Sequence, residues 1–89
     1  MPDAPSTDAL TAALTAALAA AGQAHHEYEQ HALGGTHDEQ WPAFYAAYVL
    51  GRLGDFVSPT DLARWLEDTP GASNWAAAAA AYVQRQLGA

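Results

Sequence analysis

Histidine and carboxylate side chains gather in one short stretch of the chain. All four histidines lie between residues 25 and 37, with acidic residues among them. His25 and Glu29 are four residues apart, which on a helix places both side chains on the same face. Imidazole and carboxylate together suit zinc, manganese or iron. The spacing therefore makes His25 and Glu29 candidate metal ligands.

A complete metal site needs further ligands, and the sequence offers few. Metal-binding helical bundles usually draw their ligands from several helices. Beyond residue 31 the chain has one histidine, His37, with Asp38 beside it. We therefore expect no bound metal and no cofactor, and we keep a site at His25 and Glu29 as the alternative. The polar residues around this pair are His26, Glu27, Gln30 and His31. We expect them to form a solvated face, on which Glu27 and His31 make an ordinary ion pair.

Aromatic residues follow the histidines at helical spacing. Trp41, Phe44, Tyr45 and Tyr48 favour the core of a helical bundle, with Trp41 largely buried between the first two helices. The same residues could instead wall a small pocket, since ligand pockets are apolar with a few converging polar groups. In that case the candidate ligand-binding residues are His25, Tyr28, Glu29, Asp38, Trp41 and Tyr45.

Other catalytic chemistry finds little support in the composition. The chain has no cysteine, so a thiolate nucleophile and a disulfide are excluded. It has no lysine and no glycine-rich phosphate loop after a strand. Ser58 and Ser73 are better explained as helix caps. We identify no catalytic residue and lean toward a protein that is not an enzyme.

The charge balance argues against two classes of partner. The net charge is −7, with three arginines as the only cationic side chains apart from histidine. Nucleic-acid binding depends on clustered positive charge, so no nucleic-acid partner is expected, and an anionic membrane surface is disfavoured for the same reason. The apolar run over residues 9–22 is too short and too rich in alanine to span a bilayer. The acidic N-terminus does not resemble a targeting segment, so a cytoplasmic location is expected.

Start and stop signals divide the chain into four helices. The signals that start helices are Thr7 or Asp8, Asp38, Ser58 with Pro59, and Ser73 or Asn74, and those that end them are Gly34 with Gly35, Gly54, Pro70 and Gly88. No segment alternates like a strand. The sequence predicts an all-α fold, a compact bundle of one long, one medium and two short helices. Residues 1–89 form a single domain, in which residues 1–7 are a flexible tail.

Part of the chain carries a recognisable pattern. Tyr28-Glu29 is followed by Gly35 and Asp38, and then by a Trp-Pro-x-Phe-Tyr-Ala run over residues 41–46. Over residues 24–53 the chain resembles small bacterial helical proteins of uncharacterised activity. The resemblance supplies no catalytic residues. It implies that Glu29, Asp38, Trp41, Pro42 and Tyr45 belong to one structural unit.

These observations favour a non-enzymatic binding or interaction module. The alanine-rich faces of the first and fourth helices are smooth enough for self-association, so a homodimer or a protein partner is expected. The alternative is a small metal- or ligand-binding protein, which could be an enzyme, that uses His25, Glu29 and Asp38. Physically, the Gly34-Gly35 turn should fold the second helix back along the first and bring Glu29 to the start of the second helix.

Overall fold

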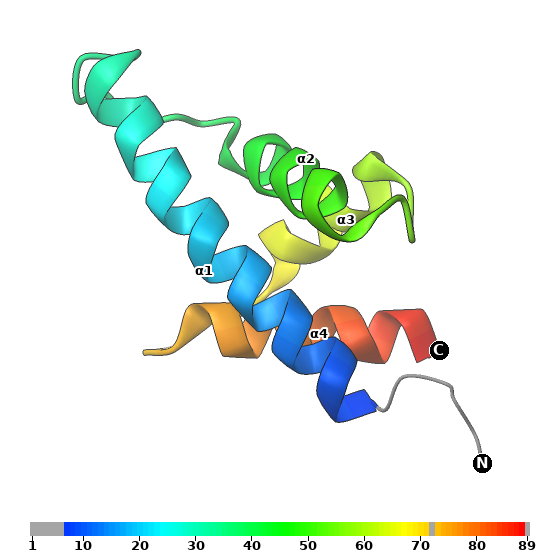
Figure 1. The fold of residues 1–89 in the computed structure, drawn as a ribbon. Helices are drawn as coiled ribbons and strands as arrows, with labels where there is room; N and C mark the ends of the chain where they lie inside the picture. The colour runs from blue at the N-terminus through cyan, green and yellow to red at the C-terminus, as the bar shows by residue number, and fades with distance from the viewer. Residues whose placement is uncertain (1–6, 72, 89) are drawn as a thin grey trace.

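Helices account for all the regular structure in the computed structural model, which describes residues 7–71 and 73–88. The helices are α1 (Thr7–His31), α2 (Trp41–Leu53), α3 (Pro59–Asp68) and α4 (Trp75–Gly88) (Figure 1). Their lengths are 25, 13, 10 and 14 residues, so α4 matches α2 and only α3 is short. Within the described ranges, no helix combines the length and apolar character needed to cross a membrane.

The four helices pack in a ring, which confirms the predicted all-α four-helix bundle. α1 contacts α2 and α4, and α3 contacts the same two helices, which closes the ring. Figure 1 shows α4 crossing the N-terminal half of α1, while the C-terminal end of α1 extends beyond the other helices before the chain turns back into α2. The predicted return of the second helix along the first is therefore confirmed.

Most helix boundaries follow the predicted signals. The Ser58 hydroxyl accepts a hydrogen bond from the Asp61 backbone N–H at 3.1 Å, which caps α3. Asn74 accepts one from the Ala77 N–H at 3.4 Å and caps α4. Gly54 follows α2 with φ +97°, a left-handed conformation that glycine adopts without steric cost. Of the predicted tail, residues 1–6 lie outside the described part, as do the side chains of Thr7 and Asp8 that were expected to cap α1.

The predicted start of the second helix is wrong. Asp38 looked like its N-cap, yet α2 begins at Trp41, after Gln40, which makes no side-chain cap. The Asp38 side chain instead accepts a hydrogen bond from the Gln40 N–H at 2.9 Å, in a turn that precedes the helix. Pro42 then occupies the first turn, where its missing N–H costs no helical hydrogen bond.

The interior is built from leucine, valine and alanine rather than from the aromatic residues. The core cluster consists of Leu14, Ala17, Leu18, Ala46, Val49, Leu50, Leu62, Leu66, Ala79, Ala80 and Val83. The aromatic residues of α2 that were expected to form the core are only partly buried. Alanines on α1 and α4 let these helices approach closely. The space between the helices is therefore filled by leucine, valine and alanine side chains, and the large aromatic rings lie at its edge. Of the alanines on these faces, Ala17, Ala21, Ala79 and Ala80 are buried within the chain, whereas Ala12, Ala16 and Ala19 of α1 remain exposed.

Candidate functional site

A hydrogen-bonded cluster ties the C-terminal end of α1 to the turn before α2. His25 is 6% exposed, and its Nε2 atom lies 3.0 Å from the Asp38 Oδ2 atom. The Asp38 backbone N–H donates to Glu29 Oε2 at 2.8 Å. Glu29 Oε2 also lies 3.9 Å from His25 Nε2, so the two carboxylates face the same imidazole. Sequence spacing placed Glu29 on the same helix face as His25, but the closer partner of the imidazole is Asp38.

Two glycines and the end of α1 hold this cluster in place. Gly34 and Gly35 both have positive φ, at +64° and +86°, which lets the chain reverse within a few residues after His31. The Gly35 N–H donates to the Glu29 carbonyl at 2.8 Å and closes the turn. The chain then runs back toward α1, so that Asp38 reaches His25, 13 residues earlier in the sequence.

The hydrogen bonds define the charge state of Asp38. The Gln40 backbone N–H and the His25 ring both donate to the carboxylate, and they hold the pKa of Asp38 below its ordinary value of 3.8. Asp38 is therefore ionised at neutral pH. Because an ionised carboxylate can only accept, the proton of the shared hydrogen bond sits on His25 Nε2.

Three aromatic rings from two helices meet beside this cluster. Trp41 and Tyr45 of α2 lie 5.5 Å apart between ring centroids, and Trp75 of α4 lies 5.7 Å from Trp41 and 5.5 Å from Tyr45. The interplanar angles are 82°, 79° and 89°, so the three ring planes are nearly mutually perpendicular. Edge-to-face contacts of this kind stabilise aromatic pairs. Trp41 is accordingly only partly buried and packs against α4, which differs from its expected burial between α1 and α2.

The rings and the polar cluster border one concave space, which we call the aromatic hollow. Its volume is about 310 Å³, and its lining residues are His25, Glu29, His37, Trp41, Tyr45 and Trp75. They come from α1, the turn, α2 and α4, so three helices and a loop converge on it. His37 is mostly exposed at its rim, with Nδ1 3.4 Å from Glu29 Oε2.

Tyr45 reaches from α2 across to α1 at the inner side of the aromatic hollow. A Cβ atom at position 22 would lie 3.2 Å from the Tyr45 hydroxyl oxygen, so the glycine of α1 makes room for the ring. Partial burial, and secondarily the Glu29 carboxylate, raise the pKa of Tyr45 above 10.0, so the hydroxyl keeps its proton through neutral and mildly basic pH.

The structure brings together most of the predicted site residues. His25, Glu29, Trp41 and Tyr45 line the aromatic hollow, and Asp38 lies directly behind His25. Tyr28 does not take part: it is 41% exposed, and its ring packs against Phe44 at 5.4 Å on the outside of the bundle. Two lining residues were absent from the predicted ligand-binding set, His37 and Trp75. Trp75 was missed because only the packing of α4 brings it beside Trp41 and Tyr45.

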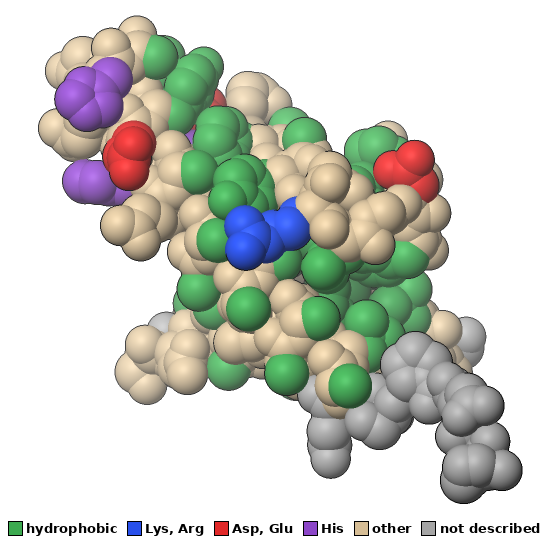
Figure 2. All heavy atoms as spheres, viewed as in Figure 1, with side chains coloured by type: hydrophobic (Ala, Val, Ile, Leu, Met, Phe, Trp, Pro, Cys, Tyr) green, Lys and Arg blue, Asp and Glu red, His purple; other side chains and the backbone are tan. Residues whose placement is uncertain are grey.

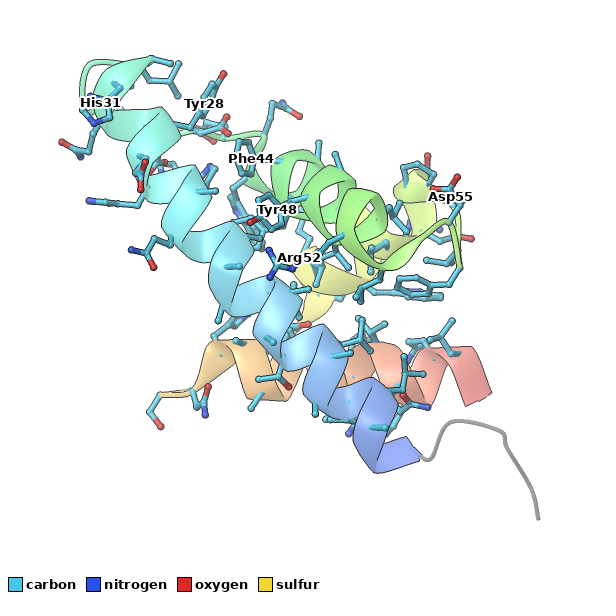
Figure 3. All side chains as sticks on the ribbon, viewed as in Figure 1. Tyr28, His31, Phe44, Tyr48, Arg52 and Asp55 are labelled. Atoms are coloured by element: carbon cyan, nitrogen blue, oxygen red, sulfur yellow. The ribbon has the colours of Figure 1, made fainter. Side chains whose placement is uncertain are left out.

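The outer surface carries a second aromatic feature, which we call the outer strip and which consists of Tyr28, Phe44 and Tyr48. Figure 3 shows these residues in a row where α1 and α2 meet, with Arg52 at the end of the row. The Arg52 guanidinium donates to the Tyr48 hydroxyl at 3.3 Å. In Figure 2 hydrophobic side chains run along this face toward that cationic group.

A second, larger hollow lies between α2 and α3. It measures about 500 Å³ and is walled mainly by small residues of the two helices, including Pro42, Ala43, Ala46 and Ala63, with Arg64 and acidic residues at its edges. It contains no aromatic ring and no histidine. Its chemistry is therefore less specific than that of the aromatic hollow.

The histidines and carboxylates do not converge on a common point. Among residues 7–71 and 73–88, no group of three or more His, Asp or Glu side chains is placed to hold a metal ion. The reason is visible in the cluster: Asp38 is hydrogen-bonded to His25, and Glu29 to a backbone N–H, so both are already engaged with protein groups. His26, Glu27, Gln30 and His31 are exposed, as predicted, although within the described residues Glu27 and His31 form no ion pair.

The lining of the aromatic hollow combines aromatic rings with imidazole, carboxylate and phenol groups. Its hydroxyl group is the Tyr45 phenol, whose proton is held firmly, and no serine, threonine or thiol lines it. The His25 imidazole donates through Nε2 to the Asp38 carboxylate. The fold and the site together define the class, a small all-α four-helix protein with an aromatic hollow. Comparisons with protein families, with curated proteins and with solved structures give no match.

Proposed function

We propose that this protein is a small non-enzymatic binding module whose ligand sits in the aromatic hollow. The observation that carries the proposal is the convergence of three aromatic rings and a polar cluster from α1, α2 and α4 on one concave space. Ligand sites typically combine apolar walls with a few placed polar groups, in volumes of roughly 300–1,000 Å³. The aromatic hollow, at about 310 Å³, falls at the lower end of that range and suits a small ligand.

Pre-organisation also supports the proposal. The hydrogen bond that His25 donates to the Asp38 carboxylate, and the one that the Asp38 backbone N–H donates to Glu29, fix the turn that forms one wall before any ligand arrives. A preformed wall lowers the ordering cost of binding. The edge-to-face contacts between the three rings restrain the aromatic part of the lining in the same way.

A fragment screen on untagged protein tests the proposal. Neutral, anionic and cationic fragments are compared by thermal shift and by tryptophan fluorescence, because Trp41 and Trp75 line the aromatic hollow. The matched variants are Trp75→Ala and Tyr82→Ala, which both remove an aromatic ring from α4, only one of which lines the aromatic hollow. We expect some fragments to stabilise wild type and Tyr82→Ala but not Trp75→Ala. The absence of any such fragment in all three charge classes contradicts the proposal.

Self-association through the outer strip is a second candidate. Tyr28 is 41% exposed and continues the partly buried rings of Phe44 and Tyr48, which gives an aromatic surface outside the core. Exposed apolar surface of this kind is common at interfaces. Light scattering after size exclusion tests it: a dimer that Tyr28→Ser converts to monomer supports the candidate, and a monomeric wild type at high micromolar concentration rejects it.

A further inference from the structure

We infer that the aromatic hollow takes an organic cation, specifically a small free molecule with an alkylated ammonium group. The inference rests on the proposed binding function and names its ligand class. A cation over the face of an aromatic ring is attracted by the negative charge of the π system, and tryptophan gives the strongest attraction. Two tryptophans and a tyrosine supply ring surface here, in three nearly perpendicular planes.

The polar part of the aromatic hollow has the matching charge. The Glu29 carboxylate lines it, and only its Oε2 oxygen is engaged: within the described residues, no hydrogen bond reaches Oε1. Asp38 lies behind His25 and is ionised, because its hydrogen bonds lower its pKa. No arginine lines the aromatic hollow, and the whole chain has a net charge of −7. The local and the overall field both favour a cation over an anion.

The aromatic walls favour an alkylated ammonium over a bare one. Ring faces offer no strong hydrogen-bond acceptor to replace the water around an N–H group, whereas alkyl groups on nitrogen lose little hydration when they are buried. The charge of an alkylated ammonium is spread over its carbon shell, which can contact several rings at once. The volume of the aromatic hollow, about 310 Å³, accommodates one such group.

Isothermal titration with an isosteric pair tests the inference directly. Choline is the cation, and 3,3-dimethyl-1-butanol is its neutral carbon analogue of the same shape. We expect choline to bind roughly tenfold more tightly than the neutral analogue, and 3,3-dimethylbutanoate, the anion, not to bind measurably. Raising the salt concentration should weaken choline binding, since part of the attraction is between charges.

Four variants locate the effect. Trp75→Phe should weaken choline binding several-fold, because phenylalanine is the poorer cation–π partner. Glu29→Gln should also weaken it, whereas Glu27→Gln, the same change of net charge at an exposed position of α1, should leave it unchanged. His37→Gln should strengthen binding, because it removes a ring whose Nδ1 lies 3.4 Å from Glu29 Oε2 and competes for that carboxylate. His37 is largely exposed, so this variant leaves the fold intact.

The outcomes separate the inference from the proposed function. Equal or tighter binding of the neutral analogue, at the same residues, overturns the inference and leaves the binding function standing. Binding of none of the three probes, together with a negative fragment screen, overturns both. Phosphatidylcholine vesicles form a further arm: co-sedimentation without binding of free choline overturns the assignment to a small free molecule.

Discussion

The carboxylate of Glu29 is the point at which the structure can be probed most sharply. It receives the Asp38 backbone N–H at 2.8 Å, nine residues further along the chain, and its side chain is only 18% exposed. Glu29→Gln removes the charge and keeps an amide oxygen that can still accept the N–H. The substitution therefore tests the charge of the hydrogen bond and not its existence.

The expected cost follows from the difference between two kinds of hydrogen bond. A bond to a charged group contributes about 1.5–3 kcal/mol to stability, and an ordinary one about 0.5–1.5 kcal/mol. Glu29→Gln should therefore lower the free energy of unfolding by about 1–2 kcal/mol. In a domain of this size each kcal/mol lost from the free energy of unfolding lowers Tm by roughly 4–8 °C.

Urea denaturation followed by circular dichroism measures this change. Glu27→Gln is the control, because it makes the same change of net charge on the same helix at an exposed position. We expect the control to stay within about 0.5 kcal/mol of wild type. A Glu29→Gln protein that is as stable as wild type, or more stable, refutes the reasoning. Greater stability would mean that the fold holds the carboxylate in place at a cost.

Three further predictions follow from burial and titration. Leu66 is 0% exposed in the core, so Leu66→Ala should cost on the order of 2–5 kcal/mol in urea denaturation, and a cost under 1 kcal/mol contradicts the packing described. The lowered pKa of Asp38 stabilises the fold fully above its unfolded value of 3.8, and this contribution is lost as the pH falls through the folded value; stability should drop below about pH 4, and less steeply in Asp38→Asn. Because its pKa is raised, the Tyr45 hydroxyl keeps its proton in the folded state, so the free energy of unfolding should fall as the pH rises past 10.0. Absorbance at 295 nm should show one tyrosine that ionises last, and Tyr45→Phe should remove that step. A last step that persists in Tyr45→Phe would contradict the assignment.

Local signals predicted the helices well and the degree of burial of the aromatic residues poorly. Ser58, Gly54 and the Gly34-Gly35 turn act through hydrogen bonds and backbone freedom within a few residues, so their effects can be predicted from sequence. The start of α2 could not, because Asp38 is drawn away from a capping role by His25, which only the folded chain brings within 3.0 Å. The aromatic core was wrongly predicted because close packing of alanines on α1 and α4 depends on how the helices cross.

In the candidate site, too, the local relations between residues could be predicted from the sequence and the long-range ones could not. The spacing of His25 and Glu29 and of Trp41 and Tyr45 placed each pair on one helix face, and all four residues do line the aromatic hollow. Trp75 carried a weak signal, a tryptophan directly after the Asn74 cap, but no periodicity links it to a residue 30 positions earlier. Its place beside Tyr45 depends on the path of α4 across α1.

The most direct test of a ligand site in the aromatic hollow is an NMR titration that follows the indole N–H signals of the three tryptophans. Trp41 and Trp75 line the aromatic hollow, and Trp65 on α3 does not, so the protein contains its own control. The probes are choline, its neutral analogue and the matching carboxylate. We predict that at least one probe shifts the Trp41 and Trp75 signals in a saturable way and leaves Trp65 in place. Signals that stay fixed with all three probes, or a Trp65 signal that moves equally, would contradict a ligand site at this position.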